Sequence, residues 1–274
     1  MIAVFVLCIT LLSGAAQAAD GYTGIHPSMT SGLQITAGAF FSRTDNEYRL
    51  KSGPESGTKV DTDDLGIDDT NTVPFGTLRW RFTDRWRVEG NYFSIDTDGK
   101  IRASEPIDWG DLDFEVGVEL KTKAKTKIAR AALGYSFVKR DHVELGAGVG
   151  LHYLDWETTL KGDATIDGQP VISASRKASV DGWAPNLALF GGYALNSQWL
   201  LSGRVDWISA EIGDISGSLW RFGASVIYQP FEHVGFGAGY DYVNGNIDYK
   251  DGDEKTSIDA SYYGPTLFVT LNFL

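Results

Sequence analysis

The chain has 274 residues, a net charge of −12 and 22% charged residues, so it lacks the basic balance of a nucleic-acid-binding protein. Its single cysteine, Cys8, excludes a disulfide framework and a Cys-rich zinc site. Glycine (32 residues) and aromatic residues (14 Phe, 12 Tyr and 8 Trp) are abundant, and most of them lie in segments with strand-like alternation.

The start of the chain has the composition of a secretory signal peptide. An uncharged apolar run at 2–12 is followed by small residues and by the A-x-A pattern of Ala16 and Ala18. About eleven apolar residues are too few to cross a bilayer as a helix. We therefore expect residues 1–18 to be a signal peptide cleaved near Ala18, and residues 19–32 to form a periplasmic N-terminal segment.

From residue 33 onward, apolar and polar residues alternate with a period of two. In 199–208, for example, Trp199, Leu201 and Val205 fall on one face, and Arg204 and Asp206 fall on the other. A pleated strand sorts side chains in this way, whereas helical spacing would scatter them around a cylinder. The pattern predicts ten strands, at 33–43, 72–82, 86–97, 116–138, 142–160, 182–195, 199–210, 218–229, 234–248 and 261–273.

The connections between these strands alternate in length. An outer-membrane barrel has this rhythm, because its periplasmic turns are short and its extracellular loops are long. The sequence therefore predicts an all-β fold, a ten-stranded antiparallel transmembrane β-barrel meander over 33–274. Eight or twelve strands remain an alternative, since 98–115 has room for a hairpin. Four connections are tight (83–85, 139–141, 196–198 and 230–233) and five are longer (44–71, 98–115, 161–181, 211–217 and 249–260).

Aromatic residues flank all four tight turns. Aromatic rings favour the headgroup zone of a bilayer, so this row predicts an aromatic girdle at the periplasmic face. Its expected members are Trp80, Phe82, Trp86, Tyr135, Phe137, Tyr193, Trp199, Tyr228 and Phe236.

Two segments carry a resemblance to a known class. Residues 81–86 (RFTDRW) resemble a typical first periplasmic turn. Residues 267–274 (LFVTLNFL) resemble the C-terminal signal read by the barrel assembly machinery, although Phe273 is penultimate here and Leu274 follows it. The chain thus resembles bacterial outer-membrane β-barrel proteins of the small OmpA-like and OmpW-like group.

This resemblance implies a place in the cell outer membrane of a Gram-negative bacterium. It implies contact with outer-membrane lipid and lipopolysaccharide, and contact with the barrel assembly machinery during biogenesis. It implies no cofactor, and it specifies no activity.

The strand faces opposite the apolar ones carry charge. A charge facing lipid at the midplane costs about 2–4 kcal/mol, so these side chains are expected in the lumen. A ten-stranded barrel is narrow, and charges enclosed there should pair with one another. The expected lumen charge network is Arg79, Arg81, Arg87, Glu89, Arg130, Glu144, His152, Arg204, Asp206, Arg221 and Asp241.

Three functions remain open. The network can be a plug that holds the barrel shut, which leaves a structural or interaction role through the extracellular loops. It can instead line a narrow small-solute channel of the OmpW-like kind. An enzyme at the outer rim is the third hypothesis, but His152 is the one histidine expected to point into the barrel, and the Asp141–His142 pair falls at a periplasmic turn. We predict no catalytic residue.

The first long connection is acidic. Carboxylate oxygens are ligands for Ca²⁺ and Mg²⁺, but the spacing does not match an EF-hand. We interpret it as a solvated loop, with a weak divalent site that bridges to lipopolysaccharide as the alternative. The residues concerned are Asp61, Asp63, Asp64, Asp68 and Asp69.

Four lysines alternate along the fourth predicted strand, at 121, 123, 125 and 127. They form either a basic face for lipopolysaccharide phosphates or a solvated strand extension. The fourth and fifth strands exceed the 9–11 residues needed to cross a bilayer, so we expect the barrel to project beyond the outer surface. Loops on such a scaffold are where binding would occur.

Overall fold

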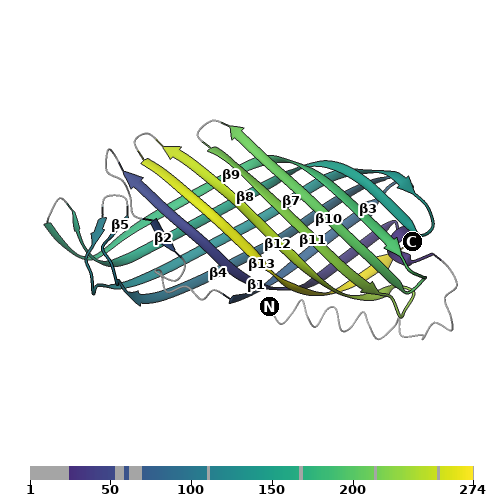
Figure 1. The fold of residues 1–274 in the computed structure, drawn as a ribbon, viewed down its shortest axis with the longest axis horizontal. Helices are drawn as coiled ribbons and strands as arrows, with labels where there is room; N and C mark the ends of the chain where they lie inside the picture. The colour runs from purple at the N-terminus through teal and green to yellow at the C-terminus, as the bar shows by residue number, and fades with distance from the viewer. Residues whose placement is uncertain are drawn as a thin grey trace.

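The computed structural model describes residues 25–52, 59–61, 70–109, 112–166, 169–212, 215–251 and 254–273. They form an elongated closed barrel of tilted strands (Figure 1). Each wall strand pairs antiparallel with its neighbours along the chain, and β1 pairs with β13 to close the barrel. The predicted ten-stranded meander is therefore confirmed. The wall strands are β1 (Leu33–Ser52), β3 (Thr70–Arg81), β4 (Trp86–Arg102), β7 (Glu119–Lys139), β8 (Val143–Ile166), β9 (Gln169–Ala194), β10 (Trp199–Ile212), β11 (Ile215–Tyr228), β12 (Val234–Asp251) and β13 (Glu254–Phe273).

The alternation along each strand separates an outward face from an inward face. On β10, Trp199 and Leu201 are exposed at 40% and 41%, whereas Leu200 and Asp206 are buried at 4% and 0%. We call the end of the barrel with the four tight connections the turn end, and the opposite end the loop end. No helix in the described ranges is long and apolar enough to cross a membrane.

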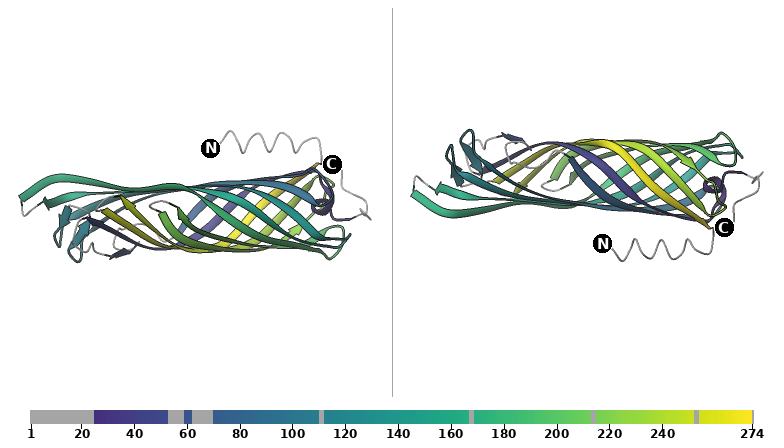
Figure 2. Two further views of the ribbon diagram at one scale, coloured as in Figure 1. Left: turned by 90° about the horizontal axis from the view of Figure 1, so that it is seen from above. Right: turned by 90° about the horizontal axis from the view of Figure 1, so that it is seen from below.

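The connections at the loop end are shorter than the sequence predicts. The β8–β9 ladder continues to Ile166 and Gln169, and the β12–β13 ladder to Asp251 and Glu254. The expected loops 161–181, 211–217 and 249–260 are thus largely strand. The prediction was wrong because a strand above the membrane needs no apolar outward face, so its alternation fades while its backbone ladder persists. Figure 2 shows the β8–β9 hairpin reaching farthest from the turn end.

The connection at 98–115 does contain a hairpin, formed by β5 (Ile107–Trp109) and β6 (Leu112–Phe114). It stays out of the wall, since β6 meets β8 at a single bridge, Asp113 with Thr165. A short strand, β2 (Lys59–Asp61), pairs with the outer part of β1. The wall count is therefore unchanged.

A four-residue helix, α2 (Pro27–Thr30), precedes β1 and lies at the turn end (Figure 2). His26 caps it, because its Nδ1 accepts a hydrogen bond from the Ser28 backbone N–H at 3.2 Å. The predicted signal peptide and residues 19–24 lie outside the described residues.

Candidate functional site

The aromatic residues at the turn end form a row on the outer surface. All nine expected members are exposed, and neighbours on adjacent strands contact each other. The ring centroids of Trp86 and Tyr135 are 4.9 Å apart, and those of Trp199 and Tyr228 are 4.7 Å apart. The row has the placement expected of an interfacial girdle.

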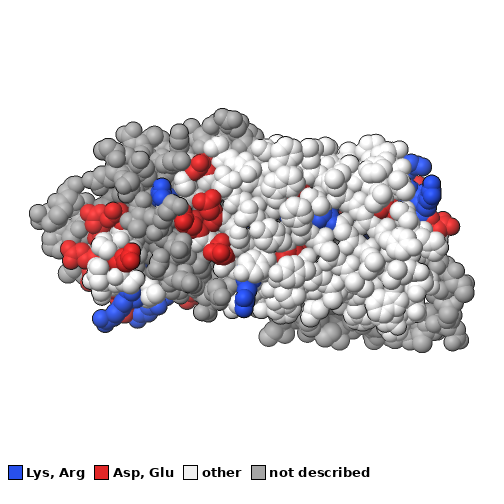
Figure 3. All heavy atoms as spheres, in the orientation of Figure 1, with Lys and Arg blue, Asp and Glu red and all other residues white. Residues whose placement is uncertain are grey.

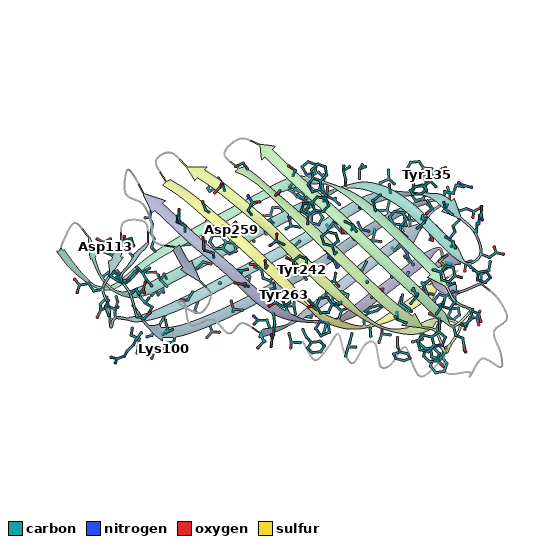
Figure 4. The ribbon with its side chains drawn as sticks, viewed as in Figure 1. Lys100, Asp113, Tyr135, Tyr242, Asp259 and Tyr263 are labelled. Atoms are coloured by element: carbon teal, nitrogen blue, oxygen red, sulfur yellow. The ribbon has the colours of Figure 1, made fainter. Side chains whose placement is uncertain are left out.

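A second aromatic row, nearer the loop end, was not predicted. Trp207, Trp220, Phe222, Tyr242 and Tyr263 follow one another across β10, β11, β12 and β13, with successive ring centroids 5.9–6.5 Å apart. Figure 4 labels Tyr242 and Tyr263 of this row and Tyr135 of the first. The signal was present in the sequence, because each hairpin repeats its turn-flanking aromatics farther along the same strand face.

The two rows bound a band of the outer surface that is nearly free of charged atoms and is called the uncharged band below (Figure 3). Along β10, the band runs from Trp199 to Trp207, which is roughly 26 Å at ~3.3 Å per residue. With a strand tilt of about 35–45°, its height is roughly 20 Å, near the hydrophobic height of outer-membrane barrels. Lys, Arg, Asp and Glu gather on both sides of the band in this view.

Inside the barrel, Glu144 is the centre of one group of charges. Arg81 donates from both Nη atoms to the two Oε atoms of Glu144, each at 2.9 Å. Lys139 Nζ lies 3.0 Å from Glu144, and Arg87 lies 3.8 Å from it. Ser136 Oγ also donates to this carboxylate. Lys139 and Ser136 were not predicted. Ser136 carries no charge, and Lys139 was expected in a tight connection and follows a β-bulge between Ser136 and Val138.

A second group is centred on Asp206 and Glu89. Arg204 donates to Asp206 from Nε at 2.6 Å and from Nη2 at 2.7 Å, and to Glu89 at 2.8 Å. Arg130 contacts Glu89 directly and lies 3.4 Å from Asp206. Asn186, a neutral residue that charge patterning could not reveal, donates to Asp206 at 3.0 Å.

The other predicted members are less connected. Arg221 and Asp241, on adjacent strands, form a pair at 2.8 Å. Arg79 donates to the Ser28 carbonyl oxygen at 2.9 Å, and it forms no ion pair within the described part of the chain. His152 is half-buried on the inward face of β8, and none of the ion pairs among the described residues includes it. The structure thus brings nine of the eleven predicted residues into ion pairs, with Arg79 and His152 beside them.

Apolar side chains fill the lumen toward the loop end, which the sequence did not indicate. Phe40, Val73 and Ile95 form a buried layer with Phe75 and Phe93 packed against it. Above it, the β5–β6 hairpin packs on the wall strands and covers the interior. The buried members of that outer cluster are Ala103, Ile107, Leu112, Phe114, Leu120, Ala124, Trp156, Leu160, Ala164, Ala174, Ala178 and Ile258.

The segment before β1 lies within the mouth of the turn end. Met29 packs with Leu200 and Ile227 and is 2% exposed. Gln34 Nε2 donates to Asn272 Oδ1 at 2.7 Å, which also accepts from Ser31 at 3.2 Å. Burial, with the neighbouring charge of Arg79, lowers the pKa of His26 from 6.5 to about 4.

The alternating lysines of β7 face outward beyond the second aromatic row, where acidic side chains pair with three of the four, Lys121, Lys125 and Lys127. Lys127 lies 2.6 Å from Asp155, and Lys125 lies 3.2 Å from Asp96. Lys121 lies 3.8 Å from Glu119, which Lys100 (labelled in Figure 4) also contacts at 3.0 Å. This arrangement favours a solvated, ion-paired strand extension over an open basic face.

Parts of two predicted sites lie outside the described residues. Of the acidic loop, Asp61 belongs to β2 without a described side chain, and Asp63, Asp64, Asp68 and Asp69 are not described. Among the residues that are described, no group of three His, Cys, Asp or Glu side chains could hold a metal ion. Of the assembly signal, Phe273 ends β13 and is 41% exposed, and Leu274 is not described.

Comparison with known proteins gives matches to solved structures only. The sequence matches no family model and no curated protein. Among solved structures, the outer membrane protease OmpT from Escherichia coli matches with a TM-score of 0.58 at 10% identity, over 88% of this chain and 96% of that one. OprG from Pseudomonas aeruginosa matches with a TM-score of 0.36 at 16% identity, over 92% and 99%. The toluene transporter TodX of P. putida matches with a TM-score of 0.36 at 9% identity, over 90% and 91%.

The likeness to OmpT bears on the fold, and at 10% identity it bears on nothing else. It agrees with the closed antiparallel meander, and with the uncharged band between two aromatic rows. On these grounds the chain has the fold of small bacterial outer-membrane β-barrels, a closed ten-stranded antiparallel meander.

Proposed function

We propose that this protein is a closed outer-membrane barrel whose role is structural or interaction-based, performed by the part that projects at the loop end. The observation that carries the proposal is the charge network across the lumen. Arg204 on β10 pairs with Glu89 on β4, four strands away around a wall of ten. A pair that joins nearly opposite walls occupies the middle of the lumen.

Each end of the barrel supports the same proposal. Toward the loop end, Phe114, Leu120 and Leu160 are 0–1% exposed inside the apolar cluster that includes the β5–β6 hairpin. At the turn end, α2 occupies the mouth, and Lys139 donates to its Met29 carbonyl oxygen. The apolar cluster and α2 thus narrow the two ends of the lumen, and the charge network closes its middle.

Because the proposed lumen is closed, we look for the interaction surface on the part of the barrel that projects at the loop end. We place the turn end in the periplasm and the ion-paired extensions of β7, β8 and β9 at the cell exterior, because these projecting hairpins take the place of the long extracellular loops of such barrels. We propose that the two aromatic rows contact lipid at the two interfaces, and that the extension meets lipopolysaccharide. Its rigid hairpins would present binding residues at their tips.

Conductance tests the closure. The chain from residue 19 onward is refolded, its folding is checked by heat-modifiable gel mobility, and it is recorded in a planar bilayer. We expect no discrete steps from the wild type. Discrete, ion-selective steps would overturn closure and favour the small-solute channel.

A pair of double variants gives the matched comparison. Arg204→Ser with Asp206→Ser removes a lumenal pair without stranding one charge of that pair, and it is expected to admit ions. Lys177→Ser with Glu157→Ser removes a surface pair of 2.7 Å, whose side chains are 53% and 41% exposed, and it is expected to stay silent. If both variants are silent, the apolar filling rather than the charge network closes the lumen.

A further inference from the structure

The lumen contains a cavity of about 210 Å³ between the charge network and α2. At ~30 Å³ per water molecule, it has room for several waters or for one small solute. Phe75, Phe190 and Phe268 form apolar parts of its wall, which lowers the local dielectric and strengthens charge interactions there. Four arginines and two carboxylates line it: Arg79, Arg87, Arg204 and Arg221, with Glu89 and Asp241.

Both carboxylates of the cavity already have close partners. Glu89 contacts Arg130 and accepts from Arg204 at 2.8 Å. Asp241 accepts two hydrogen bonds from Arg221, at 2.9 and 2.8 Å. They neutralise Arg204 and Arg221, so the remaining positive charge of the cavity belongs to Arg79 and Arg87.

Arg79 and Arg87 have guanidinium N–H donors that their described hydrogen bonds do not use. A guanidinium carries five N–H donors. Arg79 donates one side-chain hydrogen bond among the described residues, to the Ser28 carbonyl oxygen at 2.9 Å. Arg87 lies 3.8 Å from Glu144 and 3.9 Å from Glu89, beyond hydrogen-bond distance of either, and its guanidinium carbon sits 3.4 Å from the centroid of the Phe190 ring. Arg79 has no ion pair among the described residues and Arg87 has two long ones, and buried cations in this state favour an anion that supplies the missing acceptors.

We propose that this cavity binds one small oxyanion, a carboxylate or a phosphate, between Arg79 and Arg87. The planar forks of two guanidinium groups match the paired oxygens of these anions, and the hydrogen bonds are charge-assisted. The hydroxyl groups of Ser202 and Ser225, which lie 2.9 Å apart on the same cavity wall, offer further polar contacts. This site goes beyond the closed-barrel function, since closure by itself requires no ligand.

The test is calorimetric titration of the refolded chain in detergent. Inorganic phosphate and acetate are the two probes, in separate titrations at constant ionic strength, with the protein refolded in low chloride. We expect saturable one-to-one binding of at least one probe, and the ratio of the two affinities identifies the preferred oxyanion. Absence of saturable binding for both probes would overturn the proposal.

Two variants locate the site. Arg79→Gln should weaken binding of the preferred probe at least tenfold. Arg140→Gln changes an exposed arginine in a tight connection at the same end of the barrel, and it should bind as the wild type does. Equal loss in both variants would indicate general charge attraction and refute the site. A barrel that conducts but still binds phosphate in an Arg79-dependent way would refute closure and leave this site standing.

Discussion

Removing a carboxylate from the lumen should cost more stability than removing an arginine. Asp206 is 0% exposed and accepts from Arg204, Arg130 and Asn186. Asp206→Asn keeps the shape but leaves two guanidinium groups facing an amide. Breaking a buried ion pair by removing one partner costs about 3–5 kcal/mol, so we expect a loss in this range.

Arg204→Leu removes three hydrogen bonds but should cost less. Asp206 keeps Arg130 at 3.4 Å and Asn186 at 3.0 Å, and Glu89 keeps its contact with Arg130. No carboxylate is left alone, and one excess cation is gone. We expect a loss of about 2 kcal/mol, near the value of a single charge-assisted hydrogen bond.

The assay is urea unfolding of the refolded barrel, followed by tryptophan fluorescence. Lys177→Leu, at an exposed pair, is the control and should change stability by less than about 1 kcal/mol. If Arg204→Leu costs as much as Asp206→Asn or more, the lumen holds no excess of positive charge. That result would refute the reasoning by which Asp206→Asn is expected to cost more stability than Arg204→Leu.

Three further predictions concern the mouth, the band and the outer cluster. The unfolded chain protonates His26 below pH 6.5 and the folded chain only near pH 4, so stability of about 3 kcal/mol is lost as pH falls through this window. Urea midpoints at pH 7 and pH 4.5 measure this loss, and His26→Asn, which keeps a capping acceptor, should show a smaller drop. Val149→Arg, in the uncharged band and 57% exposed, should cost about 2–4 kcal/mol in vesicles. Thr159→Arg, on the same outward face but above the band, should be nearly neutral. If Thr159→Arg and Val149→Arg cost equal stability, the band does not lie where we place it. Phe114→Ala should cost about 3–5 kcal/mol, because its side chain is 1% exposed within the outer cluster. A loss below about 1 kcal/mol would mean that the β5–β6 hairpin is not packed into the outer cluster.

The faces of the strands could be predicted because they follow from local covalent geometry. Successive side chains of a strand point to opposite sides, so Arg204 and Asp206 had to share a face with each other and not with Trp199 or Trp207. The tight connections and their aromatic neighbours are also local features, and they set the strand order and the closed meander. Polar continuations such as 161–166 were missed, because above the bilayer no hydrophobic alternation marks them.

The pairing inside the barrel was decided by the tertiary structure alone. Arg204 and Glu89 are far apart in the chain, and they meet because closure of ten strands brings β10 and β4 within reach across a narrow lumen. The placement of Phe114 in an apolar interior, and of Met29 in the mouth of the turn end, likewise depends on where wall strands leave space. The same is true of the cavity beside Arg79, which no single strand contains. Side-chain direction is a property of each residue and its neighbours, whereas a partner across the lumen depends on the diameter and register of the whole barrel.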